Sequence, residues 1–131
     1  MQSETQPKAP PLSAARLNAQ SKTENGFTYL CGGVGLDESN YMKQVAKQYD
    51  LMSTFAAKNG SYLTDVNVDI SDKDSKATLQ TTCSAPILLI KFPHAGIYRI
   101  RAEIGGNAQT KTAQIQDKHN MQSMVFIWPA N

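Results

Sequence analysis

The sequence predicts a mainly β protein: an antiparallel β-sandwich of about seven strands with one short helix near its N-terminus. Apolar and polar residues alternate with a period of two along most of the chain after residue 49, as in strands with one side facing water. Gly, Pro, Asn and Asp separate these segments at short intervals, where turns are expected. One early stretch has a helical period instead. Several short strands at such spacing are typical of a sandwich.

Length and composition fit a single domain. The chain has 131 residues, with 13 Lys and Arg against 11 Asp and Glu and a net charge of +2. We therefore expect no nucleic-acid partner. A monomer is also expected. The longest apolar runs are far shorter than the roughly 20 residues of a membrane-spanning helix, so no transmembrane segment is predicted. Residues 1–25 are polar and rich in proline and predict a flexible tail, which leaves residues 26–131 as the domain.

The first elements of the domain are a strand and the helix. Residues 27–31, "FTYLC", are aromatic and favour a short strand. A helix is predicted from Glu38 to about Gln48, with Asp37 as its N-cap. Apolar side chains at helical spacing form one face of it: Met42, Val45, Ala46 and Tyr49. Such a face is expected to lie on an apolar surface.

A hairpin is predicted next. Residues 49–57 and 62–70 both alternate, and Asn59-Gly60 between them favours a type I′ turn. The second strand would point one set of side chains inward: Tyr62, Thr64, Val66, Val68 and Ile70. Residues 71–76 predict a polar turn, and residues 77–82 another strand. Asn59-Gly60-Ser61 also matches a glycosylation acceptor, although the turn is the simpler interpretation.

The remaining strands follow at short spacing. Residues 86–92 are more continuously apolar than the other segments, which predicts a strand covered on both faces. After a turn at Pro93–Gly96, the next strand points one set of residues inward: Tyr98, Ile100, Ala102 and Ile104. Gly105–Asn107 predicts a hairpin turn before a strand at 108–116. A loop at 117–120 leads to a final strand at 121–129.

The two cysteines, Cys31 and Cys83, predict a disulfide. Neither has the nearby Cys or His that a zinc site would use. The alternative is a pair of buried free thiols. No signal peptide is visible, so the protein is either cytosolic or has lost its signal, with Met1 introduced for expression. We expect the second, a periplasmic or secreted protein, because disulfides persist in oxidising compartments.

From Tyr62 onward the chain resembles the carboxypeptidase regulatory-like, transthyretin-like β-sandwich domain. The resemblance lies in "YLTDVNVDISDKDSK" and in "ILLIKFPHAGIYRIRAEIGGNAQTKTAQI". The positions that match are Pro93, Gly96, Tyr98, Ala102 and Gly106. With its helical preface, the chain is also similar to small uncharacterised exported proteobacterial proteins. The resemblance covers about residues 29–128 and implies a non-catalytic accessory or binding module, without naming its ligand.

One departure from the family pattern lies in the turn. His94-Ala95 stands where the family more often has a single residue between proline and glycine. The candidate binding surface combines this turn with one polar strand face: Pro93, His94, Gly96, Arg99 and Arg101. A protein or glycan is the expected ligand, bound through loops or by strand addition at a sheet edge, and no cofactor is expected.

Other chemistries have weaker signals. His119, Met121 and Met124 lie close together and could hold copper in an exported protein, which is the alternative function. Four carboxylates near one hairpin end suggest calcium, although the full calcium-loop spacing is absent: Asp65, Asp69, Asp72 and Asp74. The glycines of "GGVGLDE" could present N–H groups to an anion. No catalytic spacing accompanies either histidine, so we expect no enzyme.

Overall fold

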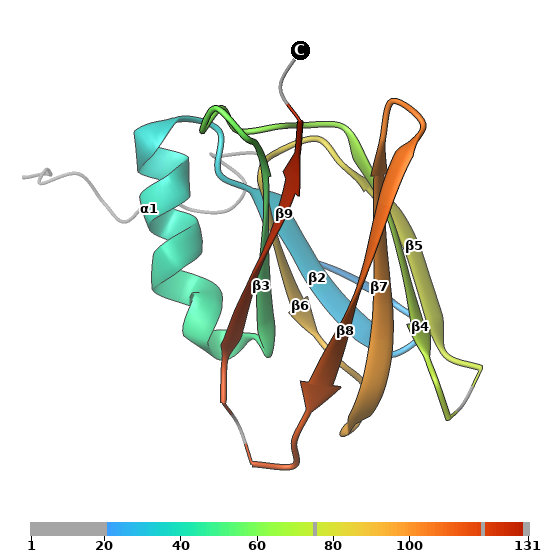
Figure 1. Ribbon diagram of the computed structural model, residues 1–131. Coiled ribbons are helices and arrows are strands. Elements are labelled where there is room, and N and C mark those ends of the chain that lie inside the picture. The colour runs from blue at the N-terminus through green and yellow to red at the C-terminus, as the bar shows by residue number, and fades with distance from the viewer. Residues whose placement is uncertain (1–20, 75, 119, 130–131) are drawn as a thin grey trace, which may run out of the picture.

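The computed structural model describes residues 21–74, 76–118 and 120–129 and confirms the β-sandwich. In this part of the chain, two sheets pack face to face and one helix lies outside the first sheet (Figure 1). Sheet A contains, in spatial order, β1 (Lys22–Glu24), β2 (Phe27–Gly32), β6 (Ile87–Lys91), β3 (Leu51–Ala57) and β9 (Gln122–Trp128). Sheet B contains β5 (Thr78–Cys83), β4 (Val66–Asp72), β7 (Gly96–Ile104) and β8 (Asn107–Ile115). No helix among the described residues is long and apolar enough to cross a membrane.

One strand pair departs from the antiparallel arrangement. β3 and β9 run parallel, in register from Leu51 opposite Gln122 to Ala57 opposite Trp128, whereas the other strand pairs of both sheets are antiparallel. The reason is that β9 follows β8, which belongs to sheet B. Since β9 reaches sheet A from the other layer, no hairpin fixes its direction relative to β3.

The helix α1 (Gly35–Val45) starts three residues before the predicted position and continues into a 3₁₀ turn, η1 (Ala46–Gln48). Val34, and not Asp37, stands at its N-cap and makes no side-chain capping bond. Glu38 performs the capping from within the helix. Its Oε1 accepts hydrogen bonds from the backbone N–H groups of Gly33 and Val34, at 2.7 and 3.1 Å. Two N–H groups without helical partners are satisfied in this way.

The predicted apolar face of the helix covers part of sheet A. Met42, Ala46 and Tyr49 are buried in a cluster with three sheet residues: Leu30, Ile87 and Leu89. Gly32 lets the helix come close, because a Cβ at this position would lie 2.8 Å from the Met42 sulfur. The alternate residues of β6, Leu88 and Ile90, point into the core between the sheets. β6 is therefore buried on both faces, as predicted.

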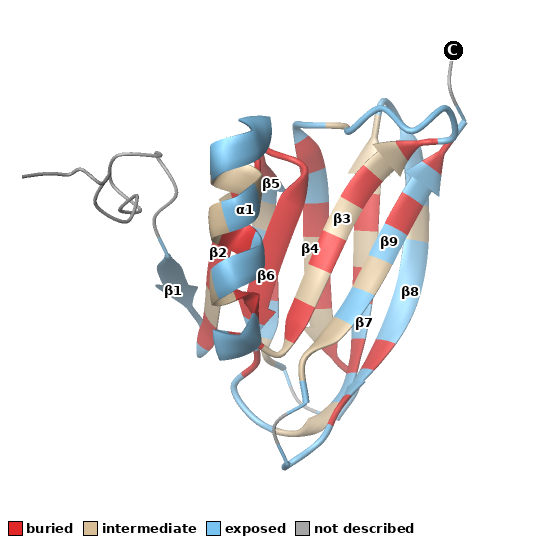
Figure 2. Ribbon diagram, turned by 90° about the vertical axis from the view of Figure 1, so that its left-hand side faces the viewer, coloured by how far each residue is buried: buried red, intermediate tan, exposed pale blue. Residues whose placement is uncertain are grey.

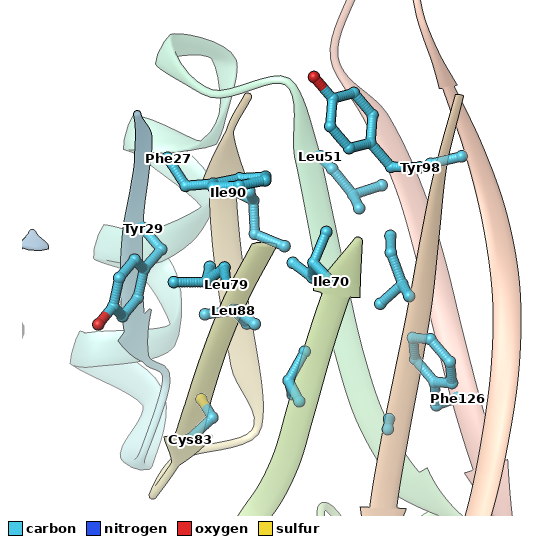
Figure 3. Close-up of a cluster of buried hydrophobic side chains, with 14 of the residues drawn as sticks. Phe27, Tyr29, Leu51, Ile70, Leu79, Cys83, Leu88, Ile90, Tyr98 and Phe126 are labelled. Atoms are coloured by element: carbon cyan, nitrogen blue, oxygen red, sulfur yellow. The ribbon is translucent and has the colours of Figure 1, made fainter. Parts of the chain in front are cut away.

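The main core lies between the sheets (Figure 3) and is rich in aromatic rings. Tyr98 from sheet B contacts Phe92 and Phe27, with ring centroids 4.4 and 5.9 Å apart. Ile100 and Ala102 follow Tyr98 into the core, which confirms the predicted alternation of β7. Phe55 and Phe126 lie next to each other on neighbouring strands of sheet A. These residues hold the two layers together by apolar burial.

One turn prediction needs correction, whereas the hairpin predicted at Gly105–Asn107 is confirmed. Asn59-Gly60 does not close a hairpin between neighbouring long strands, because β3 belongs to sheet A and β4 to sheet B. Only Gly60 of that pair has a positive φ, and β4 begins at Val66, so Tyr62 is not an inward strand residue. The predicted turn at 105–107 is a two-residue hairpin in which Gly105 and Gly106 have φ of 56° and 82°.

Asn25 and Gly26 also form a left-handed two-residue turn, with φ of 54° and 86°. They join β1 to β2. Strand β1 thus lies within the predicted flexible tail, residues 1–25, of which residues 22–24 form a strand instead. The Asn-Gly pair was the available signal for this hairpin. The rest of the predicted tail, residues 1–20, lies outside the described residues.

Cys31 and Cys83 form the predicted disulfide, with their Cα atoms 5.7 Å apart. Cys31 belongs to β2 in sheet A and Cys83 to β5 in sheet B. The bond therefore joins the two layers covalently, between positions 52 residues apart in the chain.

Replacing both cysteines, as Cys31→Ala with Cys83→Ala, is expected to lower the free energy of unfolding by about 4 kcal/mol. A cross-link closing a loop of this size restricts the unfolded chain by that amount in the chain-entropy treatment. Urea unfolding followed by tryptophan fluorescence measures the loss. Reducing the wild-type protein should produce a similar shift. A loss below about 1 kcal/mol in both cases would contradict the role assigned to the bond.

Candidate functional site

The predicted turn at Pro93–Gly96 is held by a buried carboxylate. His94 Nε2 lies 2.8 Å from Asp72 Oδ2, and His94 Nδ1 donates to the carbonyl oxygen of Ala95 at 2.7 Å. The Asp72 side chain is fully buried, whereas half of the His94 ring is exposed. Both ring nitrogens thus face acceptor oxygens, and the contact with His94 gives the buried Asp72 carboxylate a side-chain partner.

Tyr98 adds a second connection to the same turn. Its hydroxyl donates to the backbone carbonyl of His94 at 2.7 Å, and its ring packs on Phe92. Asp72 Oδ1 in turn accepts a hydrogen bond from the backbone N–H of Asp74 at 2.9 Å. The side chains of Asp72 and Tyr98 thus both support the turn that carries His94. With both of its nitrogens engaged, the His94 ring offers no free base to a substrate.

A shallow hollow of about 410 Å³ lies beside this turn, lined by Asp50, Lys91, Phe92, His94, Ala95, Ile115, Gln116 and Asp117. The Asp50 carboxylate accepts a hydrogen bond from the backbone N–H of Phe92 at 2.9 Å, so it also supports the chain here. Among the described residues, no three His, Cys, Asp or Glu side chains are grouped to hold a metal ion. The suggested calcium carboxylates are not gathered into such a group.

Arg99 and Arg101 lie on a different surface from the turn. They alternate with Tyr98 and Ile100 along β7 and so point to the outer face of sheet B. Arg101 Nη1 lies 3.6 Å from Asp69 Oδ2 and 3.4 Å from Glu103 Oε1. Two carboxylates thus offset its charge. The predicted binding surface therefore consists of two separate parts: the turn at Pro93–Gly96, held by hydrogen bonds, and the outer face of sheet B, which carries both Arg and acidic side chains.

The structure does not bring together the residues of the copper hypothesis or leave the helix start open for an anion. His119 lies outside the described residues. Met121 packs against the cluster beneath α1, and Met124 against the core between the sheets, so the two thioethers lie on opposite sides of sheet A. At the start of α1, the carboxylate of Glu38 occupies the N–H groups that could have received an anion.

A surface that the sequence did not indicate lies on the outer side of β3 and β9. In the described part of the chain, six large hydrophobic side chains are exposed: Val34, Leu36, Tyr62, Ile97, Val125 and Ile127. Ala56 is opposite Ile127 on one side and Tyr62 on the other, and Thr54 is opposite Val125. Side chains of directly opposed residues share one face of a sheet. We call these five residues, Thr54, Ala56, Tyr62, Val125 and Ile127, the β3–β9 face.

The β3–β9 face is open because α1 covers only part of sheet A. Figure 2 shows the helix in front of β2 and β6, while β3 and β9 remain uncovered beside it. Tyr62, Val125 and Ile127 are 61%, 45% and 51% exposed, and the face contains no charged residue. Contiguous apolar surface of this kind commonly marks an interaction site.

One signal could have located this face. Residues 125–128 read "VFIW", four large apolar residues in a row, so both sides of this strand had to be apolar. Phe126 and Trp128 point into the core, which leaves Val125 and Ile127 outside. The strand itself, β9, was predicted. It lies at the edge of sheet A, where α1 does not cover its outer side. The position of Tyr62 depends on the corrected path after β3 and had no comparable signal.

β8 and β9 are the edge strands of the two sheets on one side of the sandwich, and side chains form hydrogen bonds between them. The Gln109 side chain donates to the carbonyl oxygen of Ile127, and the Gln122 side chain donates to that of Gln114 at 2.6 Å. Trp128 Nε1 donates to the carbonyl of Asn107 at 3.0 Å. A hollow of about 540 Å³ lies at the Trp128 end, lined by Leu63, Ile104, Gly105, Asn107, Ala108, Gln109, Trp128 and Pro129. Side chains thus occupy part of the edge that strand addition would use.

Comparison with known proteins adds no assignment. No protein-family model matches the chain, and no curated protein is significantly similar to it.

Stability is expected to fall as the pH rises above about 10, in part because of Tyr98. Burial, and to a smaller extent the charges of Asp72 and Asp50, raise the pKa of Tyr98 above its ordinary value of 10.0, whereas its hydrogen bond to His94 lowers it. In the unfolded chain the phenol ionises at its ordinary pKa. Stability is therefore complete below that pH and is lost as the pH rises toward the folded pKa.

Urea unfolding across this alkaline range tests the effect in wild type and Tyr98→Phe. The variant should lose about 1 kcal/mol at neutral pH through the missing hydrogen bond. It should also show a shallower alkaline decline. Part of the decline should persist, because burial also raises the pKa of Tyr49. Parallel alkaline declines in the two proteins would show that Tyr98 does not carry the effect.

Proposed function

We propose that this protein is an exported, non-catalytic binding module that uses the β3–β9 face to bind a partner protein. The observation that carries the proposal is the group of exposed side chains Tyr62, Val125 and Ile127, in which the half-buried Ala56 lies between Tyr62 and Ile127. Exposing three large apolar side chains to water is unfavourable in free energy, and a partner that covered them would remove this cost.

A protein fits this face better than a glycan does. The face combines one aromatic ring with aliphatic groups and has Thr54 as its only side-chain hydroxyl apart from the Tyr62 phenol. The apolar centres of protein interfaces have this uncharged character. An uncharged face also selects an uncharged counterpart, because a partner that buried a charge here would have no ion pair to offset its desolvation. The Arg99 and Arg101 surface offers a more polar, secondary location for a ligand.

The non-catalytic part of the proposal rests on the use of the polar groups. His94 holds Asp72 and the Ala95 carbonyl, and Tyr98 holds the His94 carbonyl. Catalysis by a histidine base needs a ring nitrogen directed at substrate or nucleophile. A supporting role for these residues agrees with a scaffold whose function resides on its surface.

Export is supported by the Cys31–Cys83 bond, since such bonds persist mainly in oxidising compartments. The periplasm or the extracellular space is the proposed location. The resemblance to the transthyretin-like domain belongs to the same proposal, because accessory modules of exported proteins are what that resemblance implies. Fold alone leaves the identity of the partner open, so the surface must supply the test.

Site-specific photo-crosslinking in the native host tests this proposal. A photoreactive residue at Ile127 should produce a discrete crosslinked adduct, because this side chain is half exposed on the face, next to Ala56. The matched control places the same residue at Thr112, which lies on β8 opposite Arg99 and therefore on the outer face of sheet B. No discrete adduct is expected there.

Competition establishes that the adduct depends on the apolar character of the face. An excess of wild-type protein should suppress it, whereas an excess of the Val125→Asp, Ile127→Asp double variant should not. A charge in a protein interface typically weakens binding by several kcal/mol when it is buried without a partner. Adducts of equal yield at 112 and 127, or equal competition by both proteins, would exclude the β3–β9 face as the binding site.

A further inference from the structure

The chain contains two Asn-Gly pairs, Asn25-Gly26 and Asn59-Gly60, in very different surroundings. Asparagine before glycine is prone to lose its side-chain amide, because no Cβ hinders attack by the following backbone nitrogen. We propose that Asn59 is a site of spontaneous deamidation in the folded protein, whereas the fold protects Asn25. This modification site is independent of the proposed binding function.

The reaction needs only water. The backbone nitrogen of Gly60 attacks Cγ of Asn59, the new N–Cγ bond forms, and the Cγ–Nδ2 bond breaks. The amide proton of Gly60 leaves with the side-chain nitrogen as ammonia, which leaves a five-membered succinimide. Water then opens the ring at either carbonyl and produces aspartate or isoaspartate. No oxidant or cofactor takes part.

Three features hinder this reaction at Asn25: a hydrogen bond, a crowded glycine and the backbone conformation of the turn. Its side-chain nitrogen donates to the carbonyl oxygen of Thr78 at 2.8 Å, which ties the amide to β5 in the other sheet. A Cβ on Gly26 would lie 3.0 Å from the Pro93 side chain, so this glycine is crowded. Both turn residues also have the left-handed φ that the β1–β2 hairpin requires. Closing the succinimide ring would break the bond to Thr78 and distort the hairpin.

Asn59 has the opposite environment. It is exposed, and its Oδ1 accepts a hydrogen bond from the backbone N–H of Ser61 at 3.0 Å. This bond folds the carboxamide back over Gly60 and polarises the carbonyl that is attacked. Apart from Gly60 itself and its two chain neighbours, no described heavy atom lies within 4 Å of the Cβ position at Gly60. The Gly60 N–H donates to the Ala57 carbonyl at 2.9 Å, and this single bond must open at an exposed loop tip, where opening costs little.

The product places a new carboxylate at the margin of the β3–β9 face. Residue 59 lies in the loop between Ala57, at the end of β3, and Tyr62. The neighbouring Lys58 is the nearest positive charge in sequence. Deamidation therefore adds a negative charge to the loop that connects β3 to Tyr62, next to the uncharged β3–β9 face.

Peptide mapping by mass spectrometry tests the inference. The folded, disulfide-bonded full chain is incubated in mildly alkaline buffer, and the conversion of Asn to Asp and isoaspartate is followed separately at residues 25 and 59. Asn59 should convert about tenfold faster than Asn25, the factor that one retained hydrogen bond of ordinary net strength provides. Equal rates, or faster conversion of Asn25, would overturn the proposal.

The unfolded chain is the matched control. In denaturant with the disulfide reduced, both pairs lose their surroundings and their rates should become similar. A difference that persisted unchanged would assign the selectivity to local sequence and would remove the structural argument. The Asn59→Gln variant should lack the product at residue 59 and keep the slow conversion at Asn25, which confirms the assignment of the peptides.

Discussion

Strand β6 is apolar on both faces, and the arrangement of the whole molecule depends on covering both. Leu88 and Ile90 need the second sheet, whereas Ile87 and Leu89 need a layer on the other side. One helix of eleven residues supplies that layer. A helix has about the width of two strands, so α1 protects β2 and β6 and leaves β3 and β9 uncovered. The β3–β9 face is thus a direct result of a wide sheet with one short helix upon it.

The two ends of the sandwich are tied by different chemistry. β4 begins opposite Cys83, whose disulfide reaches β2 in the other sheet, and it ends at Asp72, which binds His94. One tie is covalent and crosses between the layers. The other is the contact between the buried Asp72 carboxylate and the half-exposed His94 ring, which supports the turn between β6 and β7. The apolar core between them needs no polar contact to set the register, because alternation along β4 and β7 already places their apolar residues inside.

Much of this fold is readable from local patterns. The alternation of β7, the doubly buried β6, the apolar face of α1 and the cysteine pair each depend on spacing within one segment or on a single residue type. The parallel pairing of β3 with β9 was not readable, because it depends on which layer β9 joins after β8. The prediction that Asn59-Gly60 joins two long strands in a hairpin was wrong for a similar reason. The chain turns back there only as far as the bridge between Ala56 and Tyr62, and the next strand lies in the other sheet. Asn25-Gly26, a true hairpin signal, lay in a segment whose composition favoured disorder.

The candidate site was less predictable than the fold. A residue such as Arg101 presents the same alternation whether or not Asp69 and Glu103 lie beside it, so sequence cannot tell an available charge from a paired one. Similarly, Ile127 and Ile87 are both strand isoleucines on the outer side of sheet A, and the position of the helix decides that only Ile127 is exposed. Function on such a scaffold depends on what the second layer fails to cover, which is a property of the tertiary structure.

The parallel ladder between β3 and β9 has a consequence for how the chain acquires its structure. Leu51 pairs with Gln122, so this ladder closes a very long loop, and such contacts are slow to form because chain entropy is lost before they contribute. Until β9 arrives, one margin of β3 is an unprotected template for strands of other molecules. We therefore expect the pairing of β9 with β3 to be a slow step of folding, during which the uncovered edge of β3 is open to pairing with other chains.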